Sequence, residues 1–152
     1  MVQHREMQLM NNNELDVRYD CATVDWSIVS GMLKSVGMAY HEPDVHRRAF
    51  EASHTTVFVF HAETLVGFGR ALSDGEYQAA IYDVAVHPET QGKGIGKLII
   101  QAILKHIPNC NVILYASPGK KGFYQKLGFR KMKTGMALFK DPTAMVAKGF
   151  IE

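Results

Sequence analysis

The stretch VAVHPETQGKGIGKLIIQAILKHI, from Val84 to Ile107, carries the strongest pattern in the chain. It begins with alternating apolar residues and passes through a turn in which three glycines alternate with Lys93 and Ile95. From Ile95 onward, apolar residues recur at intervals of three or four, which predicts an amphipathic helix that ends near Pro108. The segment is therefore expected to run from a strand, through a glycine turn, into a helix.

The glycine turn has the chemistry of a phosphate site. Glycines let backbone N–H groups approach phosphate oxygens without side-chain obstruction. The first turn of a helix presents unpaired amides and the positive end of the helix dipole. Lys93 and Lys97 add positive charge. These features favour a pyrophosphate as the bound group, and a tight turn without a ligand is the alternative.

Two common nucleotide-binding motifs do not fit this turn. The Walker A motif requires a glycine five residues before its second glycine and Ser or Thr after its lysine, but Gln91 and Leu98 occupy those positions. The dinucleotide-binding motif requires a third glycine where Lys97 stands. A general nucleotide-binding α/β domain is therefore the weaker interpretation.

Strand patterns occur on both sides of the glycine turn. The residues in these segments are β-branched or aromatic, or they alternate between apolar and polar. The expected strands are 15–20, 55–62, 65–73, 77–87, 111–117 and 135–140. The segment 111–117 is apolar on both faces and follows a helix, which favours parallel pairing, whereas strands joined by short turns favour antiparallel pairing.

Helical patterns fill the segments between these strands. Apolar residues recur at helical spacing in 23–38, where Thr23 or Asp25 would cap the helix. A second helix is expected at 43–53, since proline suits its first turn. The segment KKGFYQKLGF is expected to hold a short helix that ends at Gly128.

The composition is that of an ordinary soluble globular protein. A length of 152 residues favours a single domain over 1–152, with a loose polar leader at 1–13. The net charge of +2 disfavours a dedicated nucleic-acid binder, and no stretch approaches the roughly 18 apolar residues that span a bilayer. Two distant cysteines, Cys21 and Cys110, favour reduced thiols in a cytoplasmic protein. The histidines form no metal-ligand motif, so no metal is expected.

Two blocks of the sequence resemble the GNAT N-acetyltransferase superfamily. QGKGIG (91–96) is similar to the Q/R-x-x-G-x-G/A signature of that family, and GFYQKLGFRK (122–131) is similar to its later FY-x-K-x-GF element. The resemblance spans about 65–140. It places the cofactor-binding core at 77–107 and 111–130.

The resemblance implies a GNAT-like α/β (α+β) fold, in which a mixed, mostly antiparallel sheet of six or seven strands is flanked by helices. It also implies a cleft where two neighbouring parallel strands separate. The pantetheine arm of acetyl-CoA would pair with the strand edge there, and the pyrophosphate would lie on the amides of the glycine turn. The implied cofactor-binding residues are Val84, Ala85, Val86, Gln91, Gly92, Lys93, Gly94, Ile95, Gly96, Lys97, Ser117, Phe123 and Tyr124.

Acetyl transfer to an amine needs a neutral amine, a donor for the oxyanion and an acid for the departing thiolate. The resemblance implies Tyr124 as that acid, because a phenol stays protonated at neutral pH, and a packed aromatic is the alternative.

The family's glutamate would stand at Ala80, so the base is not carried over. Asp83 is the nearest acid, with a catalytic, substrate-binding or structural role, but strict alternation points it away from Ala80 unless a bulge intervenes. His87, Glu76 and a water relay are further options for the base.

Together these features predict a cytoplasmic, acetyl-CoA-dependent N-acetyltransferase. The expected reaction is direct transfer, in a ternary complex, to a primary amine of a small molecule or peptide. A non-catalytic acyl-CoA-binding module of the same fold is the alternative, because Ala80 carries no carboxylate. No nucleic acid and no membrane is an expected partner, a homodimer is left open, and the sequence does not select the amine.

Overall fold

The computed structural model describes residues 14–152, and the predicted leader at 1–13 lies outside the described residues. The chain divides into two compact units, one that ends at Leu114 and one from Tyr115 to Glu152. The first unit holds the sheet and the glycine turn, and the second holds two short helices. No helix among the described residues is long and apolar enough to cross a membrane.

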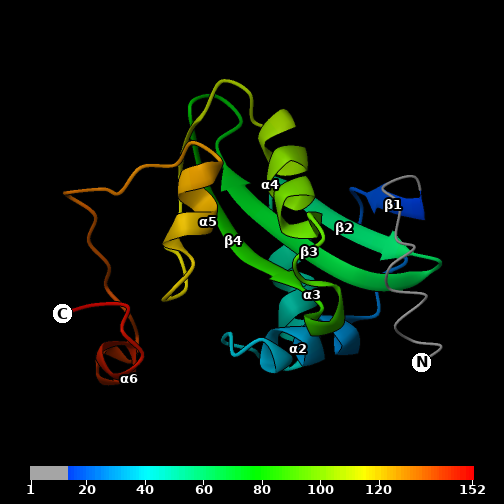
Figure 1. The fold of residues 1–152 in the computed structure, drawn as a ribbon, viewed down its shortest axis with the longest axis horizontal. Coiled ribbons are helices and arrows are strands. Elements are labelled where there is room, and N and C mark those ends of the chain that lie inside the picture. Colours follow the sequence, from blue (N-terminus) through cyan, green and yellow to red (C-terminus); the bar gives the residue numbers. More distant parts are fainter. Residues whose placement is uncertain (1–13) are drawn as a thin grey trace. The chain divides into compact units, whose positions relative to one another are not determined.

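The first unit is built on one five-stranded sheet (Figure 1). Its strands are β1 (Leu15–Arg18), β2 (Thr55–His61), β3 (Thr64–Ser73), β4 (Gln78–Val86) and β5 (Asn111–Ile113). They lie in chain order; the first three pairings are antiparallel, and β4 pairs with β5 in parallel. The predicted mixed, mostly antiparallel sheet is therefore confirmed, with five strands in residues 14–152 where six or seven were expected.

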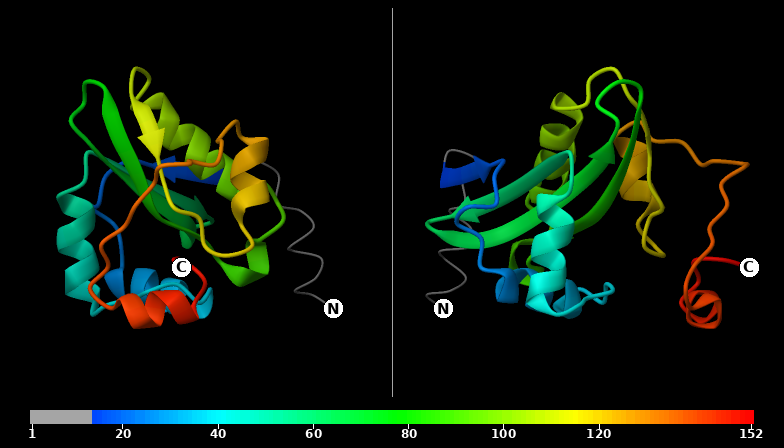
Figure 2. Two further views of the ribbon diagram at one scale, coloured as in Figure 1. Left: turned by 90° about the vertical axis from the view of Figure 1, so that its left-hand side faces the viewer. Right: turned by 180° about the vertical axis from the view of Figure 1, so that it is seen from behind.

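Helices cover both faces of this sheet (Figure 2). Helix α4 (Ile95–Lys105) lies on one face, and α2 (Trp26–Ser35) and α3 (Pro43–Glu51) lie on the other. On the face of α2 and α3, fully buried side chains of helices and strands pack together. They include Val29, Leu33, Phe50, Phe58 and Phe68. Burying a side chain of this size contributes roughly 1.5–3 kcal/mol, so this core holds both helices on the sheet.

Helix α4 approaches β3 closely because two glycines of that strand face it. A Cβ atom on Gly67 would lie 2.9 Å from Cδ1 of Ile99 and 3.1 Å from the carbonyl oxygen of Ala85. A Cβ atom on Gly69 would lie 2.9 Å from Cγ2 of Ile99. No ordinary side chain fits at these distances, so the glycines set how near α4 lies to the sheet.

Local sequence signals account for the turns and helix starts. Asp25, one of the two predicted caps, accepts a hydrogen bond from the backbone N–H of Ser27 at 3.0 Å and begins α2. The turn between β2 and β3 consists of Ala62 and Glu63, with φ values of 46° and 64°. Two residues of positive φ are what a type I′ hairpin requires, so the predicted hairpin is confirmed.

The second unit contains α5 (Lys121–Lys126) and α6 (Pro142–Ala147). The predicted end of α5 is confirmed, since Gly128 has a φ of 96° and the N–H of Phe129 bonds back to the carbonyl of Tyr124 at 3.1 Å. Helix α6 was not predicted. Its start has a recognisable signal, because Asp141 accepts from the N–H of Ala144 at 3.0 Å.

The predicted strand at 135–140 is wrong. This segment has no regular structure, and the side chains of Met136 and Leu138 are fully exposed. A strand satisfies its backbone hydrogen bonds only with a partner, and no other strand lies among residues 115–152. The strand predicted at 111–117 is real but ends earlier, at Ile113.

Candidate functional site

Strand β4 carries a bulge shortly before its end. Between Tyr82 and Ala85, which pair with β3 on either side, β4 has two residues, Asp83 and Val84, where β3 has only Gly69. Asp83 adopts a φ of 55°, in the left-handed region. That conformation costs a residue with a side chain roughly 1–2 kcal/mol, so its surroundings must hold it in place.

The bulge turns Asp83 toward the face that carries Tyr82 and Ala80. Oδ2 of Asp83 accepts a hydrogen bond from Nε of Arg70 at 2.8 Å, and the Arg70 guanidinium lies 5.5 Å from the centre of the Tyr82 ring. Strict alternation would have placed Asp83 opposite Ala80, and the bulge named as the exception does occur. The nearest acid therefore shares the face of the Ala80 position.

Among the described residues of the first unit, no strand pairs with the outer edge of β4 beyond Ala80. Strand β5 pairs only with the first three residues of β4. On the inner edge, His87 donates its N–H to the carbonyl of Val66 at 2.8 Å. Because successive amides of a strand point to opposite edges, the N–H of Val86 points to the outer edge. The segment 84–86 thus offers backbone groups of the kind that an extended amide chain can pair with.

The chain then turns from β4 into α4 through a fixed loop. A 3₁₀ helix, η2 (Pro88–Thr90), follows the strand, and Nε2 of Gln91 donates to the carbonyl of Val86 at 3.1 Å. Gly92 and Gly94 have φ values of 79° and 85°, which favour glycine. Apart from its chain neighbours, a Cβ atom on either glycine would meet no atom of residues 14–152 within 4 Å, so these residues leave space for a ligand beside the loop.

Helix α4 begins against this loop, with Gly94 as its N-cap. The N–H of Leu98 donates to the carbonyl of Gly94 at 3.0 Å and closes the first turn. The amides of Ile95, Gly96 and Lys97 precede that bond and have no carbonyl within the helix to donate to. Three amides, the positive end of the dipole and open space make a cradle that fits a pyrophosphate.

Three predicted site residues, Ser117, Phe123 and Tyr124, lie in the second unit. The Tyr124 ring lies 4.9 Å from that of Phe123 and 5.7 Å from that of Phe129, measured between ring centres. Burial raises the pKa of the Tyr124 hydroxyl. The phenol therefore remains a proton donor at neutral pH, as the chemistry of a departing thiolate requires.

Two polar groups near Asp83, one partly buried and one buried, were not predicted. The Arg70 side chain is only 16% exposed and pairs with Asp83. His46 on α3 is buried, and its Nε2 accepts a hydrogen bond from the backbone N–H of His41 at 2.8 Å. Burial lowers the pKa of His46. The sequence did hold a usable signal for the pair of Arg70 and Asp83, namely an arginine within an apolar strand and an acid in the next strand. The sequence held no comparable signal for His46.

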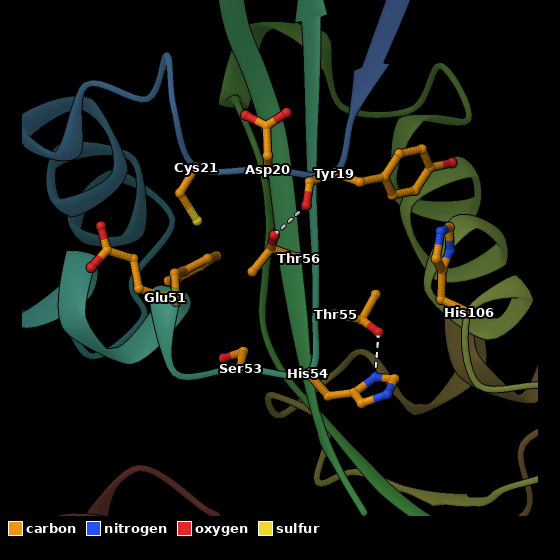
Figure 3. A pocket seen from close by; sticks show the side chains of 10 residues that line it. Tyr19, Asp20, Cys21, Glu51, Ser53, His54, Thr55, Thr56 and His106 are labelled. Atoms are coloured by element: carbon orange, nitrogen blue, oxygen red, sulfur yellow. Dashed lines mark hydrogen bonds between the residues drawn. The ribbon is translucent and has the colours of Figure 1, made fainter. Parts of the chain in front are cut away.

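A cavity of about 330 Å³ lies at the β2 side of the sheet, away from β4 (Figure 3). Its wall includes residues 19–21, the end of α3 and His106. The hydroxyl of Thr56 donates to the carbonyl of Tyr19 at 2.8 Å, across this edge. None of the predicted site residues lines the cavity. The candidate site is therefore the bulged end of β4 with the loop and the start of α4.

The sequence matches a known protein family. Residues 28–138 match the family model of the acetyltransferase (GNAT) domain, which is well over half of the chain. The chain belongs to the GNAT acetyltransferase family. This confirms the predicted family, and with it the predicted class of enzyme, an N-acetyltransferase.

Two relatives show how far the similarity of this GNAT chain extends. It is 32% identical over 129 residues to the uncharacterised N-acetyltransferase ycf52 of Porphyra purpurea, and the match covers 83% of this chain and 70% of the relative. It is 31% identical over 120 residues to serotonin N-acetyltransferase 2, chloroplastic, of Oryza sativa subsp. japonica. That match covers 74% of this chain and 60% of the rice protein.

Solved structures share the GNAT fold. A probable acetyltransferase from meticillin-resistant Staphylococcus aureus superposes with a TM-score of 0.73 at 27% identity, over 82% of this chain and 98% of that one. A GNAT family protein from Streptococcus pneumoniae gives a TM-score of 0.71 at 22% identity, over 83% of this chain and 98% of that one. The predicted fold class is confirmed. Among the described residues, no group of three or more His, Cys, Asp or Glu could hold a metal ion.

Proposed function

We propose that this GNAT protein transfers the acetyl group of acetyl-CoA to a primary amine of a small molecule or peptide, directly within a ternary complex. The observation that carries the proposal is that the outer edge of β4, with the N–H of Val86, leads through the loop directly to the amides of the first turn of α4. A strand edge suits the amide-rich pantetheine arm, and the helix start suits the pyrophosphate. The pantetheine arm and the pyrophosphate of coenzyme A would therefore both bind to one segment of chain.

In the reaction, the amine nitrogen forms a bond to the thioester carbonyl carbon and the bond from that carbon to sulfur breaks. The amine loses one proton and the departing thiolate gains one. We assign to the N–H of Val86, at the outer edge of β4, the donation to the carbonyl oxygen as that oxygen becomes negative. Tyr124 supplies the proton to sulfur, and its raised pKa keeps it protonated until then.

Asp83 serves the acceptor side of the same reaction. The bulge brings its carboxylate to the face where the family's glutamate would stand at Ala80. Arg70 holds one carboxylate oxygen, Oδ2, and fixes the direction of the group. Asp83 is therefore suited to orient the amine, or a water that removes its proton.

A non-catalytic acyl-CoA-binding module is the second candidate. It is favoured by one observation, the methyl group of Ala80 in place of a carboxylate. Such a module would bind CoA through the same edge and loop but would not release thiol from acetyl-CoA. The cytoplasmic location stays a prediction, and a homodimer stays open.

Two measurements separate these functions. Thermal unfolding with acetyl-CoA, CoA and ATP should show stabilisation by the first two and little by ATP. Thiol release from acetyl-CoA should then be followed with a panel of serotonin, other aromatic amines, polyamines and peptides with a free N-terminus or lysine. Serotonin belongs in the panel because the rice relative is named for it. No stabilisation by CoA would refute both candidates, whereas stabilisation without any amine-dependent thiol release would favour the non-catalytic module.

A further inference from the structure

The bulge in β4 fixes where the backbone groups of 84–86 lie. Without it, Asp83 and Val84 would each need a partner on β3, but only Gly69 is available between the flanking pairs. Every residue after the bulge would then shift by one position along the strand, and amides that face the outer edge would face β3 instead. The cofactor edge therefore exists only while the bulge is kept.

Arg70 connects this bulge to the rest of the first unit. Its Nε donates to Oδ2 of Asp83 at 2.8 Å, and its NH1 group donates to Oγ of Ser53 at 3.3 Å. Ser53 follows α3 and donates its own hydroxyl to the carbonyl of Ala49 at 2.8 Å. The guanidinium also lies 5.6 Å from the centre of the Phe50 ring. One partly buried side chain thus links the left-handed residue of β4 to the end of α3.

We propose that Arg70 is a positioning residue for the acetyl donor. It holds Asp83 in the left-handed conformation, and this keeps 84–86 in the register that presents the outer edge. This inference rests on the proposed function, because the outer edge matters only if it receives pantetheine. Arg70 itself need not touch the substrate. A purely structural arginine would affect stability alone, whereas a positioning arginine also sets the affinity for CoA.

The substitution Arg70→Met tests the inference through CoA binding and through the amides themselves. We expect calorimetry to show about tenfold or greater weakening of CoA binding, since a charge-assisted bond that holds the edge is lost. In the ligand-free protein, the amide signals of 84–86 should shift and their hydrogen exchange should accelerate. The KM for acetyl-CoA should rise by more than kcat falls.

A second variant separates the bulge from the ion pair. Glycine adopts a φ of 55° without strain, so Arg70→Met combined with Asp83→Gly should keep the bulge without a buried unpaired carboxylate. We expect this double variant to recover most of the CoA affinity. The matched control is Arg18→Met, which removes another partly buried, ion-paired arginine, on β1, and should leave CoA binding unchanged.

Each result decides the inference. Unchanged CoA affinity and unchanged amide signals in Arg70→Met would overturn it, as would a double variant that binds CoA no better than the single one. If the wild-type protein does not bind CoA, the proposed function fails and the donor role of Arg70 fails with it. A shift of the amide signals in Arg70→Met would then show that the arginine holds the bulge only.

Discussion

Tyr124 is the residue on which proton transfer to the thiolate is expected to depend. Burial raises the pKa of its hydroxyl, so wild-type kcat should hold at neutral pH and fall only above the ordinary tyrosine range. Replacing Tyr124 with Phe should lower kcat by about 10²–10⁴-fold, the usual contribution of a general acid. The dissociation constant of acetyl-CoA should change little. Steady-state kinetics with calorimetry would test this, and an unchanged kcat would remove Tyr124 from the acid role.

Gly94 should distinguish backbone strain from obstruction of the ligand. Its φ is 85° and a Cβ there meets no protein atom, so Gly94→Ala should cost only about 1–2 kcal/mol of stability. Gly94→Glu should in addition abolish CoA binding, because bulk and negative charge enter the pyrophosphate cradle. Gly37→Glu is the matched control, since Gly37 has a φ of 76° and equally open surroundings after α2. Equal loss of CoA binding in both glutamate variants would contradict the cradle.

At the scale of single residues, the sequence predicted the loop better than the acid. Gly92 and Gly94 carry their signal locally, because glycine is the residue that adopts a positive φ without steric cost. The orientation of Asp83 has no such local signal, because it depends on one extra residue in the pairing of β4 with β3. Arg70 was missed although an acid in the next strand was a usable signal, because its contact with Asp83 also depends on the bulge.

At the scale of elements, the seating of α4 on β3 depends on glycine. Gly67→Ala would place a Cβ 3.1 Å from the backbone oxygen of Ala85, which cannot move as a side chain can. We expect a loss of about 1–3 kcal/mol in the free energy of unfolding, as for other overpacked cores. Gly31 lies at an exposed position of α2 with open space around it, so Gly31→Ala should be neutral or stabilise the protein by up to about 1 kcal/mol. Denaturant unfolding would test the pair, and a Gly67→Ala variant as stable as wild type would refute the close seating.

Elements were predictable where their signals were local. The hairpin of β2 and β3, the cap of α2 and the end of α5 each follow from one or two residues, and each was found. The strand at 135–140 was not a strand, because alternation in a sequence cannot show whether a partner strand is available. Alternating residues describe a segment that can pair, and the rest of the chain decides whether it does.

At the scale of the whole molecule, the candidate site arises because the two edges of β4 are paired to different extents. The inner edge is fully engaged with β3 apart from the bulge, and the outer edge pairs with β5 only at its start. Local patterns cannot encode that difference, because it arises from where β5 ends. The family resemblance supplied it, through the expectation that two neighbouring parallel strands separate.

The stability of the whole protein should depend on pH through His46. Burial is the largest effect and lowers the pKa of this histidine. Asp83 raises this pKa by a smaller amount, and His41 and Arg70 lower it further. The unfolded chain therefore binds a proton near pH 6.5 that the folded chain does not, so the free energy of unfolding should fall as pH drops through that value. Protonation would also remove the acceptor that Nε2 offers to the N–H of His41.

The variant His46→Gln tests this dependence, because glutamine keeps an acceptor but does not titrate. Denaturant unfolding of the wild type should show greater stability at pH 8 than at pH 5, and the difference should shrink in His46→Gln. An equally steep loss of stability in wild type and His46→Gln would show that other groups govern the acid limb. In that case the buried imidazole would be a packing group of α3 without a part in the pH response.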